Sequence, residues 1–218
     1  MKIQSFCKSY DKQSVLEFPG MEFRPGKIYA VIGANGSGKS TFAKCLAGII
    51  SADEKDSILE KEVSAGYMPQ KSYAFRMSVQ KNILLGGSDK ERADKLMNAL
   101  QIHHLAKKNA SHLSGGETAR MAMDRVLLKK FDLLILDEPT AAMDVETTFL
   151  AENLIKSYCC ETGCTLIVVT HSLQQAKRIA DEVMFFHKGK LTEAGTKEKL
   201  LDTPQKAETK RFLEFYGV

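Results

Sequence analysis

The segment Gly33–Ser40, with the sequence GANGSGKS, constrains this chain more than any other stretch. It fits an eight-residue pattern of Gly, four free positions, Gly, Lys, and Ser or Thr. Residues 27–32 before it are mostly apolar and predict a short buried strand, and residues 41–50 after it carry apolar side chains at helical spacing. Strand, glycine loop and helix in this order predict a phosphate-binding loop. A flexible glycine turn would explain the glycines but not the Lys-Ser pair.

Each part of this loop has an expected role in holding a nucleoside triphosphate. Its glycines let backbone N–H groups close around phosphates, and the following helix N-terminus favours negative charge. Lys39 is expected to reach the β- and γ-phosphates, and the Ser40 hydroxyl to bind Mg²⁺. The expected nucleotide-binding positions in the loop are Gly33, Asn35, Gly36, Ser37, Gly38, Lys39, Ser40 and Thr41.

Composition places the chain among ordinary soluble α/β proteins. It has 218 residues, of which 44% are hydrophobic and 27% charged. No apolar run has the length of a membrane span, and the N-terminus lacks the apolar core of a signal peptide. We therefore expect a cytoplasmic location. The net charge of +4 comes with lysines dispersed along the chain, so we expect no nucleic-acid partner.

The order of apolar patterns predicts the fold class. Strand patterns at 133–136, 165–170 and 182–187 alternate with helical patterns at 146–158 and 172–179. Such alternation predicts a mainly parallel sheet with helices on both faces.

The middle of the chain differs from the rest. Residues 71–128 are mostly helical in pattern and predict an insert in a nucleotide-binding core. Within it, Ser88–Glu91 has the pattern of a capping box before an apolar helix face. Ahead of it, residues 1–32 predict strands broken by turns, and residues 51–61 a polar loop or short hairpin.

A second motif, Phe131–Pro139, is an apolar strand that ends in two acids. At the carboxyl edge of a parallel sheet these acids would lie beside the phosphate-binding loop. Asp137 is then expected to hold Mg²⁺, and Glu138 to polarise a water as general base. An acidic helix start is the alternative, and the neighbouring glycine loop makes it the weaker one.

A third motif, Leu113–Glu117, predicts a helix start. Ser114 and Glu117 form a capping-box pattern for a helix that runs to about residue 130. Gly115 and Gly116 disfavour a helix, so something else should require them. Bare backbone amides at a helix N-terminus bind phosphate well. Since one ATP needs only one glycine loop, this second surface would serve a nucleotide held by another subunit.

The three motifs, which follow one another in the chain as the glycine loop, Leu113–Glu117 and Phe131–Pro139, resemble the nucleotide-binding domain of ATP-binding cassette (ABC) proteins. The resemblance covers nearly the whole chain, although the family usually has Gln in place of Glu117. It implies an α/β P-loop NTPase with a mainly parallel core sheet, a trimmed antiparallel β subdomain and a compact helical subdomain. The single domain would span 1–218, with a RecA-like core at 1–70 and 129–218 and the helical subdomain at 71–128.

The resemblance implies roles for four more residues. Gln70 matches the Q-loop glutamine, which contacts Mg²⁺ and water and senses the membrane partner. His171 matches the switch histidine at the γ-phosphate, although a lone histidine after a strand can also be purely structural. Asp144 matches the D-loop aspartate, which crosses a dimer interface. Tyr10 matches the aromatic residue that stacks on adenine.

The implied site therefore has three parts. The catalytic residues are Glu138, His171, Gln70 and Lys39. The Mg²⁺ ligands are Ser40, Gln70 and Asp137. Besides the glycine loop, the nucleotide-binding residues are Tyr10, Ser114, Gly115, Gly116 and Asp144.

The resemblance also implies a function in transport. Two copies, or this chain and a related one, would dimerise on ATP and drive separate integral membrane permease subunits from the inner face of the cell membrane. The C-terminal segment resembles those of prokaryotic importer ATPases for small solutes, which favours a small ion such as an oxyanion, or an amino acid, delivered by a solute-binding protein. The ATPase of an exporter or lipoprotein-release complex, or a soluble non-transport ABC ATPase, are the alternatives. Only 31 positions separate Lys39 from Gln70, about ten fewer than the family commonly has, and this alters the surface toward a membrane partner.

Overall fold

A computed structural model of the chain describes residues 1–11, 13–53, 58–59 and 63–216. The strands are β1 (Lys2–Ile3), β2 (Phe6–Tyr10), β3 (Gln13–Phe18), β4 (Met21–Glu22), β5 (Ile28–Ile32), β6 (Ala65–Met68), β7 (Leu133–Asp137), β8 (Thr165–Val169), β9 (Glu182–His187) and β10 (Lys190–Thr196). The helices are α1 (Lys39–Leu46), α2 (Val79–Ile83), α3 (Lys90–Ala99), α4 (Gly115–Leu127), α5 (Val145–Thr162), α6 (Leu173–Ile179), α7 (Lys197–Asp202) and α8 (Ala207–Tyr216).

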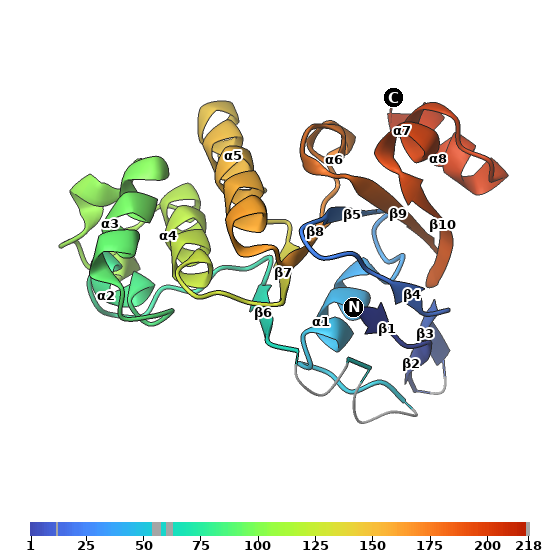
Figure 1. The fold of residues 1–218 in the computed structure, drawn as a ribbon, viewed down its shortest axis with the longest axis horizontal. Helices are drawn as coiled ribbons and strands as arrows, with labels where there is room; N and C mark the ends of the chain where they lie inside the picture. The colour runs from blue at the N-terminus through green and yellow to red at the C-terminus, as the bar shows by residue number, and fades with distance from the viewer. Residues whose placement is uncertain (12, 54–57, 60–62, 217–218) are drawn as a thin grey trace.

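Within these residues one eight-stranded sheet has the order β2-β3-β10-β9-β5-β8-β7-β6 (Figure 1). From β6 to β9 all neighbours are parallel, whereas β10 is antiparallel to β9 and β2 is antiparallel to β3. β1 and β4 form a separate two-stranded sheet. The fold class predicted from the sequence, a mainly parallel α/β sheet of the P-loop type, is confirmed.

The central strands are apolar on both faces because helices cover both. Every residue of β5, β7 and β8 is buried, as expected of parallel strands inside a layered sheet. On one face Ile135 and Ile167 pack with Phe42 of α1. On the opposite face Leu166 packs with Ile155 of α5. Ile32 of β5 packs with α6 and the C-terminal helices in a third cluster.

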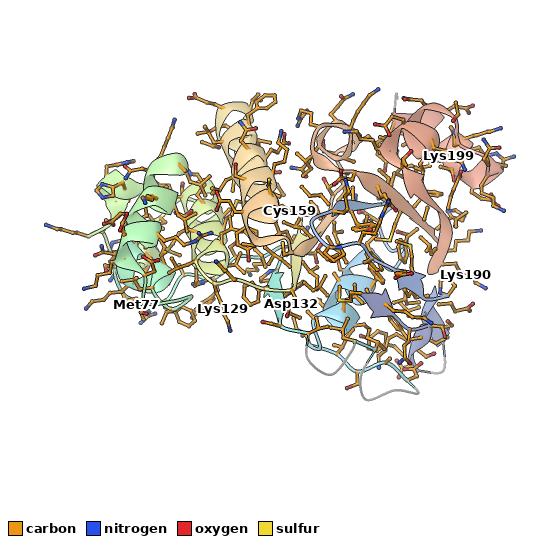
Figure 2. All side chains as sticks on the ribbon, viewed as in Figure 1. Met77, Lys129, Asp132, Cys159, Lys190 and Lys199 are labelled. Atoms are coloured by element: carbon orange, nitrogen blue, oxygen red, sulfur yellow. The ribbon has the colours of Figure 1, made fainter. Side chains whose placement is uncertain are left out.

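The interior between helices and sheet is filled with side chains (Figure 2). Cys159 of α5 is buried there, whereas Lys129 and Lys199 are exposed. Helix α5 is longer than the predicted 146–158, because Gly163 adopts a left-handed φ of 68° and ends it only there. Helix α1 is shorter than the predicted 41–50, since Gly48 adopts a φ of 67° and the helix ends at Leu46.

Two expectations in the helical region need correction. The predicted capping box at Ser88 is wrong: Asp89 caps α3 by accepting from Arg92 N at 2.9 Å, and Glu91 pairs with Lys95 one turn on. The capping box at Ser114 and Glu117 is confirmed, although α4 ends at Leu127 rather than near residue 130. An aspartate beside a serine offers the stronger, charged cap, which explains the shift of one residue at α3.

The strand and helices after His187 were not predicted. The seven residues of β10 are mostly polar and only partly buried, so their pattern gives little strand signal. Helix α8 begins where the Glu193 carboxylate of β10 accepts from Gln205 N at 2.8 Å and from Lys206 N at 3.2 Å. Such a cap comes from twelve residues away and has no sequence signature. Residues 54–57, 60 and 61 of the predicted polar loop lie outside the described residues.

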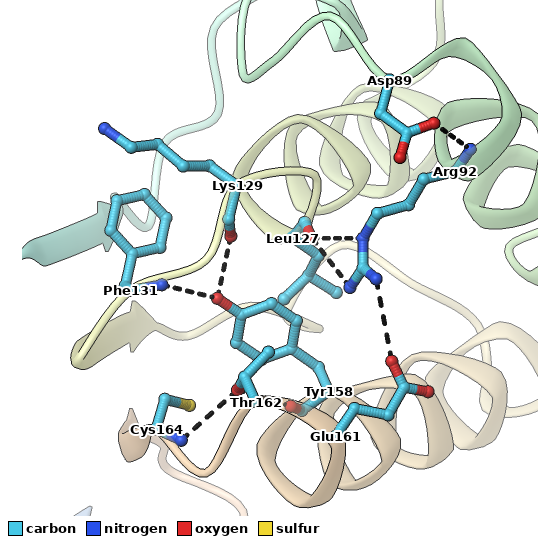
Figure 3. Close-up of polar contacts among 9 residues, drawn as sticks. All are labelled: Asp89, Arg92, Leu127, Lys129, Phe131, Tyr158, Glu161, Thr162 and Cys164. Carbon is cyan, nitrogen blue, oxygen red and sulfur yellow. Dashed lines mark hydrogen bonds and ion pairs between the residues drawn. The ribbon is translucent and has the colours of Figure 1, made fainter.

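Tyr158 ties the helical region to the sheet (Figure 3). Its hydroxyl donates to the carbonyl of Lys129, just after α4, at 2.9 Å and accepts from Phe131 N, just before β7, at 3.2 Å. Burial raises the pKa of this phenol to about 12. Nearby, Arg92 of α3 donates to the carbonyl of Leu127 at the end of α4. These bonds join α3, α4 and α5 at the point where the chain re-enters the sheet.

A close backbone approach also joins α2 to α4. A Cβ on Gly86 would lie 1.9 Å from the carbonyl oxygen of Arg125, so only glycine fits there. At the neighbouring Gly87 the closest atom to a Cβ is Leu128 Cγ at 3.5 Å, an ordinary contact. A Cβ therefore fits at position 87 but not at position 86.

We predict that Gly86→Ala lowers the free energy of unfolding by about 2 kcal/mol or more, because the α4 backbone must move. The matched control Gly87→Ala should change it by less than about 1 kcal/mol. Urea denaturation of the two variants measures the difference. Equal destabilisation would contradict the close approach at Gly86.

Candidate nucleotide-binding site

The glycine loop joins β5 to α1 in a conformation that gives three of its glycines, Gly33, Gly36 and Gly38, a positive φ. Gly38, the N-cap of α1, has a φ of 96°, and Gly33 has a φ of 149°. A Cβ on Gly33 would lie 2.2 Å from the carbonyl oxygen of Phe186. The loop is thereby held against the end of β9, and its own turn is closed by Ser37 N donating to the carbonyl of Ala34 at 3.2 Å.

Two buried polar groups of the loop fit a phosphate chain. The Lys39 ammonium donates to the carbonyls of Gly33 at 2.8 Å and Ala34 at 2.9 Å, and burial lowers the pKa of Lys39. Ser37 Oγ is buried and has no hydrogen-bond partner among the described residues. A phosphate oxygen can accept hydrogen bonds from both the Ser37 hydroxyl and the Lys39 ammonium.

The loop borders a cavity of about 220 Å³ that collects residues from distant parts of the sequence. It is lined by Val15, Asn35, Gly36, Ser37, Gly38, Lys39, Ser40, Thr41, Gln70, Glu138 and His171. The structure therefore brings Gln70, Glu138 and His171 to the glycine loop, as the sequence predicted.

Asp137 ends β7 and faces the start of α1. Its Oδ1 lies 3.4 Å from Ser40 Oγ, and its Oδ2 accepts from Tyr67 Oη at 3.1 Å. Burial raises the pKa of Asp137, and the hydrogen bonds from Ser40 and Tyr67 oppose that rise. A carboxylate and a hydroxyl so placed are hard oxygen donors that suit Mg²⁺. The described residues contain no cluster of three acidic, His or Cys side chains for a metal, and Mg²⁺ at phosphates needs none.

Glu138, one residue on, is held by residues in or just after β6 and β8, the two strands that flank β7. Its backbone N donates to the carbonyl of Val169 at 2.9 Å, and its carboxylate accepts from Gln70 Nε2 at 2.9 Å. Its Oε1 lies 2.6 Å from His171 Nε2. The backbone φ of Glu138 is 50°, in the left-handed region that costs a non-glycine residue about 1 kcal/mol. This strained turn aims the carboxylate into the cavity.

The helix start at Ser114 lies apart from this cavity. Ser114 Oγ accepts from Glu117 N at 3.2 Å, and Glu117 Oε2 accepts from Ser114 N at 2.7 Å. Gly116 has a packing reason within this chain, since its Cβ would lie 2.9 Å from the carbonyl oxygen of Ala142. Gly115 has no such constraint, because the nearest atom to its Cβ is 3.9 Å away. Packing within this chain therefore explains why residue 116 is glycine, so Gly116 no longer calls for a phosphate. Packing does not explain Gly115, for which phosphate binding stays a prediction.

The other two sequence-predicted residues lie at the surface. Asp144 caps α5 by accepting from Thr147 N at 2.8 Å and from Thr147 Oγ1 at 3.0 Å. These two hydrogen bonds lower the pKa of Asp144. Tyr10 ends β2 with 48% of its surface exposed, and Lys8 Nζ lies 5.4 Å from its ring centroid. Neither lines the cavity at the glycine loop, so their interface and adenine roles stay predictions.

Two residues at the site were missed in the sequence. Val15 of β3 lines the cavity, and Tyr67 of β6 bonds to Asp137. Tyr67 reaches that carboxylate because β6 and β7 pair in parallel, with Tyr67 opposite Ile135. No local pattern announces either contact, since both depend on strand pairing across the fold.

Comparison with known proteins decides the family. The profile described as "ABC transporter" matches residues 17–141, more than half of the chain. The chain belongs to the ABC transporter family. It is 35% identical to the tungstate uptake ATP-binding protein TupC of Peptoclostridium acidaminophilum, over 88% of this chain and 96% of that protein. It is 32% identical to the phosphate import ATP-binding protein PstB of Campylobacter jejuni, over 94% of each chain.

Solved structures agree in fold. An ATP-binding subunit of an ABC transporter superposes with a TM-score of 0.83 at 20% identity, over 98% of both chains. A bacterial Atm1-family ABC exporter with ATP bound gives 0.85 at 22% identity, over all of this chain and 42% of that one. This ABC protein is accordingly an ATP-binding subunit with import-type relatives, and it is an ATPase. Such subunits dimerise and work with membrane permeases. In the described part of the chain no helix is long and apolar enough to span a bilayer.

We predict that Glu117→Gln makes stability less dependent on pH. The Ser114 N–H lowers the pKa of Glu117 below its ordinary 4.5, so the charged form stabilises the folded state above that pH. The stabilisation is lost as the pH falls through the lowered value. Denaturant unfolding should therefore find the wild type more stable than the variant at pH 7, and this difference in the free energy of unfolding should shrink as the pH falls below 4.5. A difference that is independent of pH would contradict this account.

Proposed function

We propose that this chain is the ATP-hydrolysing subunit of an importer for a small solute, with a small oxyanion as the favoured class. The observation that carries the proposal is the meeting of Gln70, Glu138 and His171 at the glycine-loop cavity, while Ser114 and Gly115 lie outside it. A helix start suited to phosphate but remote from its own loop fits a head-to-tail dimer. Each nucleotide then lies between the loop of one copy and the Ser114 segment of the other.

The site residues have distinct roles in this proposal. Lys39 and the loop amides bind the phosphates, and Ser40, Asp137 and Gln70 hold Mg²⁺. Magnesium, when bound, neutralises charge on the phosphates. Glu138 polarises the attacking water and His171 contacts the γ-phosphate, so catalysis is mostly positioning and charge stabilisation.

The remaining assignments complete the proposal. Tyr10 stacks on adenine and Asp144 lies at the dimer interface. The core spans 1–70 and 129–218, and the helical subdomain 71–128. The subunit acts at the inner, cytoplasmic face of the cell membrane, beneath integral permease subunits that receive the solute from a solute-binding protein.

The names of the relatives support import over export. Tungstate and phosphate, named for TupC and PstB, are oxyanions, and a further relative with 33% identity is a zinc import ATP-binding protein of Vibrio parahaemolyticus, over 86% of this chain and 73% of that protein. The exporter structure is similar at only 22% identity, which supports the fold and not the direction of transport.

We predict that Glu138→Gln reduces ATP turnover by at least about a hundredfold, because the variant cannot accept a proton from water. Binding of ATP should survive, since the glycine loop is intact. Turnover by phosphate release and binding by a fluorescent ATP analogue measure the two effects. Turnover close to that of the wild type would sink the assignment of Glu138.

The same variant tests the dimer. In ATP, Glu138→Gln should elute at twice the mass of the nucleotide-free chain in size-exclusion chromatography with light scattering. Adding Ser114→Arg should leave it monomeric, because a long side chain blocks the helix start against a partner's phosphate, while ATP binding is retained. A dimer that survives Ser114→Arg would contradict the head-to-tail arrangement.

The transport role predicts a membrane partner. Affinity purification of the tagged chain in detergent should recover a multispan protein, and tungstate or phosphate uptake by the cells should fall when Glu138→Gln replaces the wild type. Recovery of a wholly soluble partner would favour a non-transport ATPase, and extrusion instead of uptake would favour an exporter.

A further inference from the structure

A buried polar network joins α5 and α6, the helices that follow β7 and β8. It lies close to Glu138 and His171, which are called the catalytic pair below. Glu152 of α5 has only 2% of its side chain exposed. It accepts from Arg178 of α6 in two parallel bonds, Nε to Oε2 and Nη2 to Oε1, each 2.7 Å long. A buried carboxylate paired in this bidentate way is a strong and geometrically specific contact.

Gln175, one turn before Arg178 on the same face of α6, extends the network toward the site. Its Nε2 donates to Thr140 Oγ1 at 2.8 Å and to Glu152 Oε1 at 3.3 Å. Because an ionised carboxylate can only accept, Glu152 fixes which end of the Gln175 amide faces Thr140. Both amide hydrogens are then used, and the side chain has one defined orientation.

Thr140 belongs to the turn that carries Glu138. The turn is closed by Ala141 N donating to the carbonyl of Glu138 at 3.2 Å, and it leads to α5. His171 lies in the corresponding loop after β8, where Ser172 caps α6 by accepting from Gln175 N at 3.1 Å. Gln175 therefore contacts both loops: its backbone the loop of His171 and its side chain the loop of Glu138.

The space between the network and the catalytic pair is not filled. A cavity of about 260 Å³ has Glu138 and His171 as well as Gln175 and Arg178 among its lining residues. Helices α5 and α6 stand beside each other over the sheet (Figure 1). With a cavity behind the catalytic pair, packing alone holds the loops less firmly there, and the polar bonds carry more of their positioning.

We propose that Gln175 is a positioning residue of the ATPase site. Through Thr140 it fixes the turn of Glu138 relative to the loop of His171, so that the carboxylate and the imidazole keep the spacing that hydrolysis needs. The buried pair of Glu152 and Arg178 holds the Gln175 amide in the required orientation. This inference rests on the roles assigned to Glu138 and His171 in the proposed function.

The test is Gln175→Met in the full chain, which keeps the length of the side chain and removes both amide hydrogen bonds. Displaced catalytic groups slow the chemical step without weakening ATP binding, so kcat should fall about tenfold or more while KM for ATP changes less than about twofold. Gln174→Met, the same change at the exposed neighbouring position, is the matched control and should leave kcat unchanged. Thermal unfolding should find both variants folded at the assay temperature.

Thr140→Val removes the same bond from its other end and keeps the branched shape. It should also lower kcat, and the double variant Gln175→Met with Thr140→Val should be little slower than either single one, because both changes break one shared contact. If Gln175→Met turns over as fast as Gln174→Met, or if it raises KM with kcat unchanged, the positioning role is overturned. Neither outcome affects the assignment of Glu138. That assignment is overturned only if Glu138→Gln turns over ATP about as fast as the wild type.

Discussion

Parallel pairing of β6, β7, β8 and β5 is the constraint on which the site depends. Parallel strands end at the same edge of a sheet, so residues far apart in the sequence meet wherever those strands stop. Asp137 ends β7, Gln70 follows β6, His171 follows β8 and the glycine loop follows β5. Burial of the strands on both faces holds their ends in register, and that register sets the distances between the four.

Much of this arrangement could be predicted from the sequence because its signals are local. Continuous apolar runs announced β7, β8 and β9, and the bounds of β9 were predicted to the residue. The glycine loop was recognisable because its glycines, lysine and serine stand at fixed spacing within eight residues. Ser114 and Glu117 satisfy each other across a single helical turn, so their capping box was visible as a pattern of four residues.

The contacts that the sequence did not reveal are those between elements. Glu193 caps a helix from a neighbouring strand, and Tyr67 reaches Asp137 across a strand pair. Gln175 gave no signal in the sequence because its partner Thr140 lies 35 residues away, at the end of another strand. The sequence predicts Gly116 as a ligand-binding glycine, whereas in the structure the nearby carbonyl of Ala142 already requires a residue without a Cβ. In each case the sequence shows what kind of contact the side chain can make, but only the fold shows which residue it contacts.

The left-handed backbone at Glu138 places the proposed catalytic carboxylate in conflict with stability. A residue with a Cβ stores conformational energy at a φ of 50°, and glycine would release it. Selection for stability alone would thus favour the loss of the carboxylate, whereas the catalytic role proposed for Glu138 requires it. Under the proposed function, a related subunit that binds ATP without hydrolysing it would have no need of a carboxylate here, and glycine at this position would make that subunit more stable.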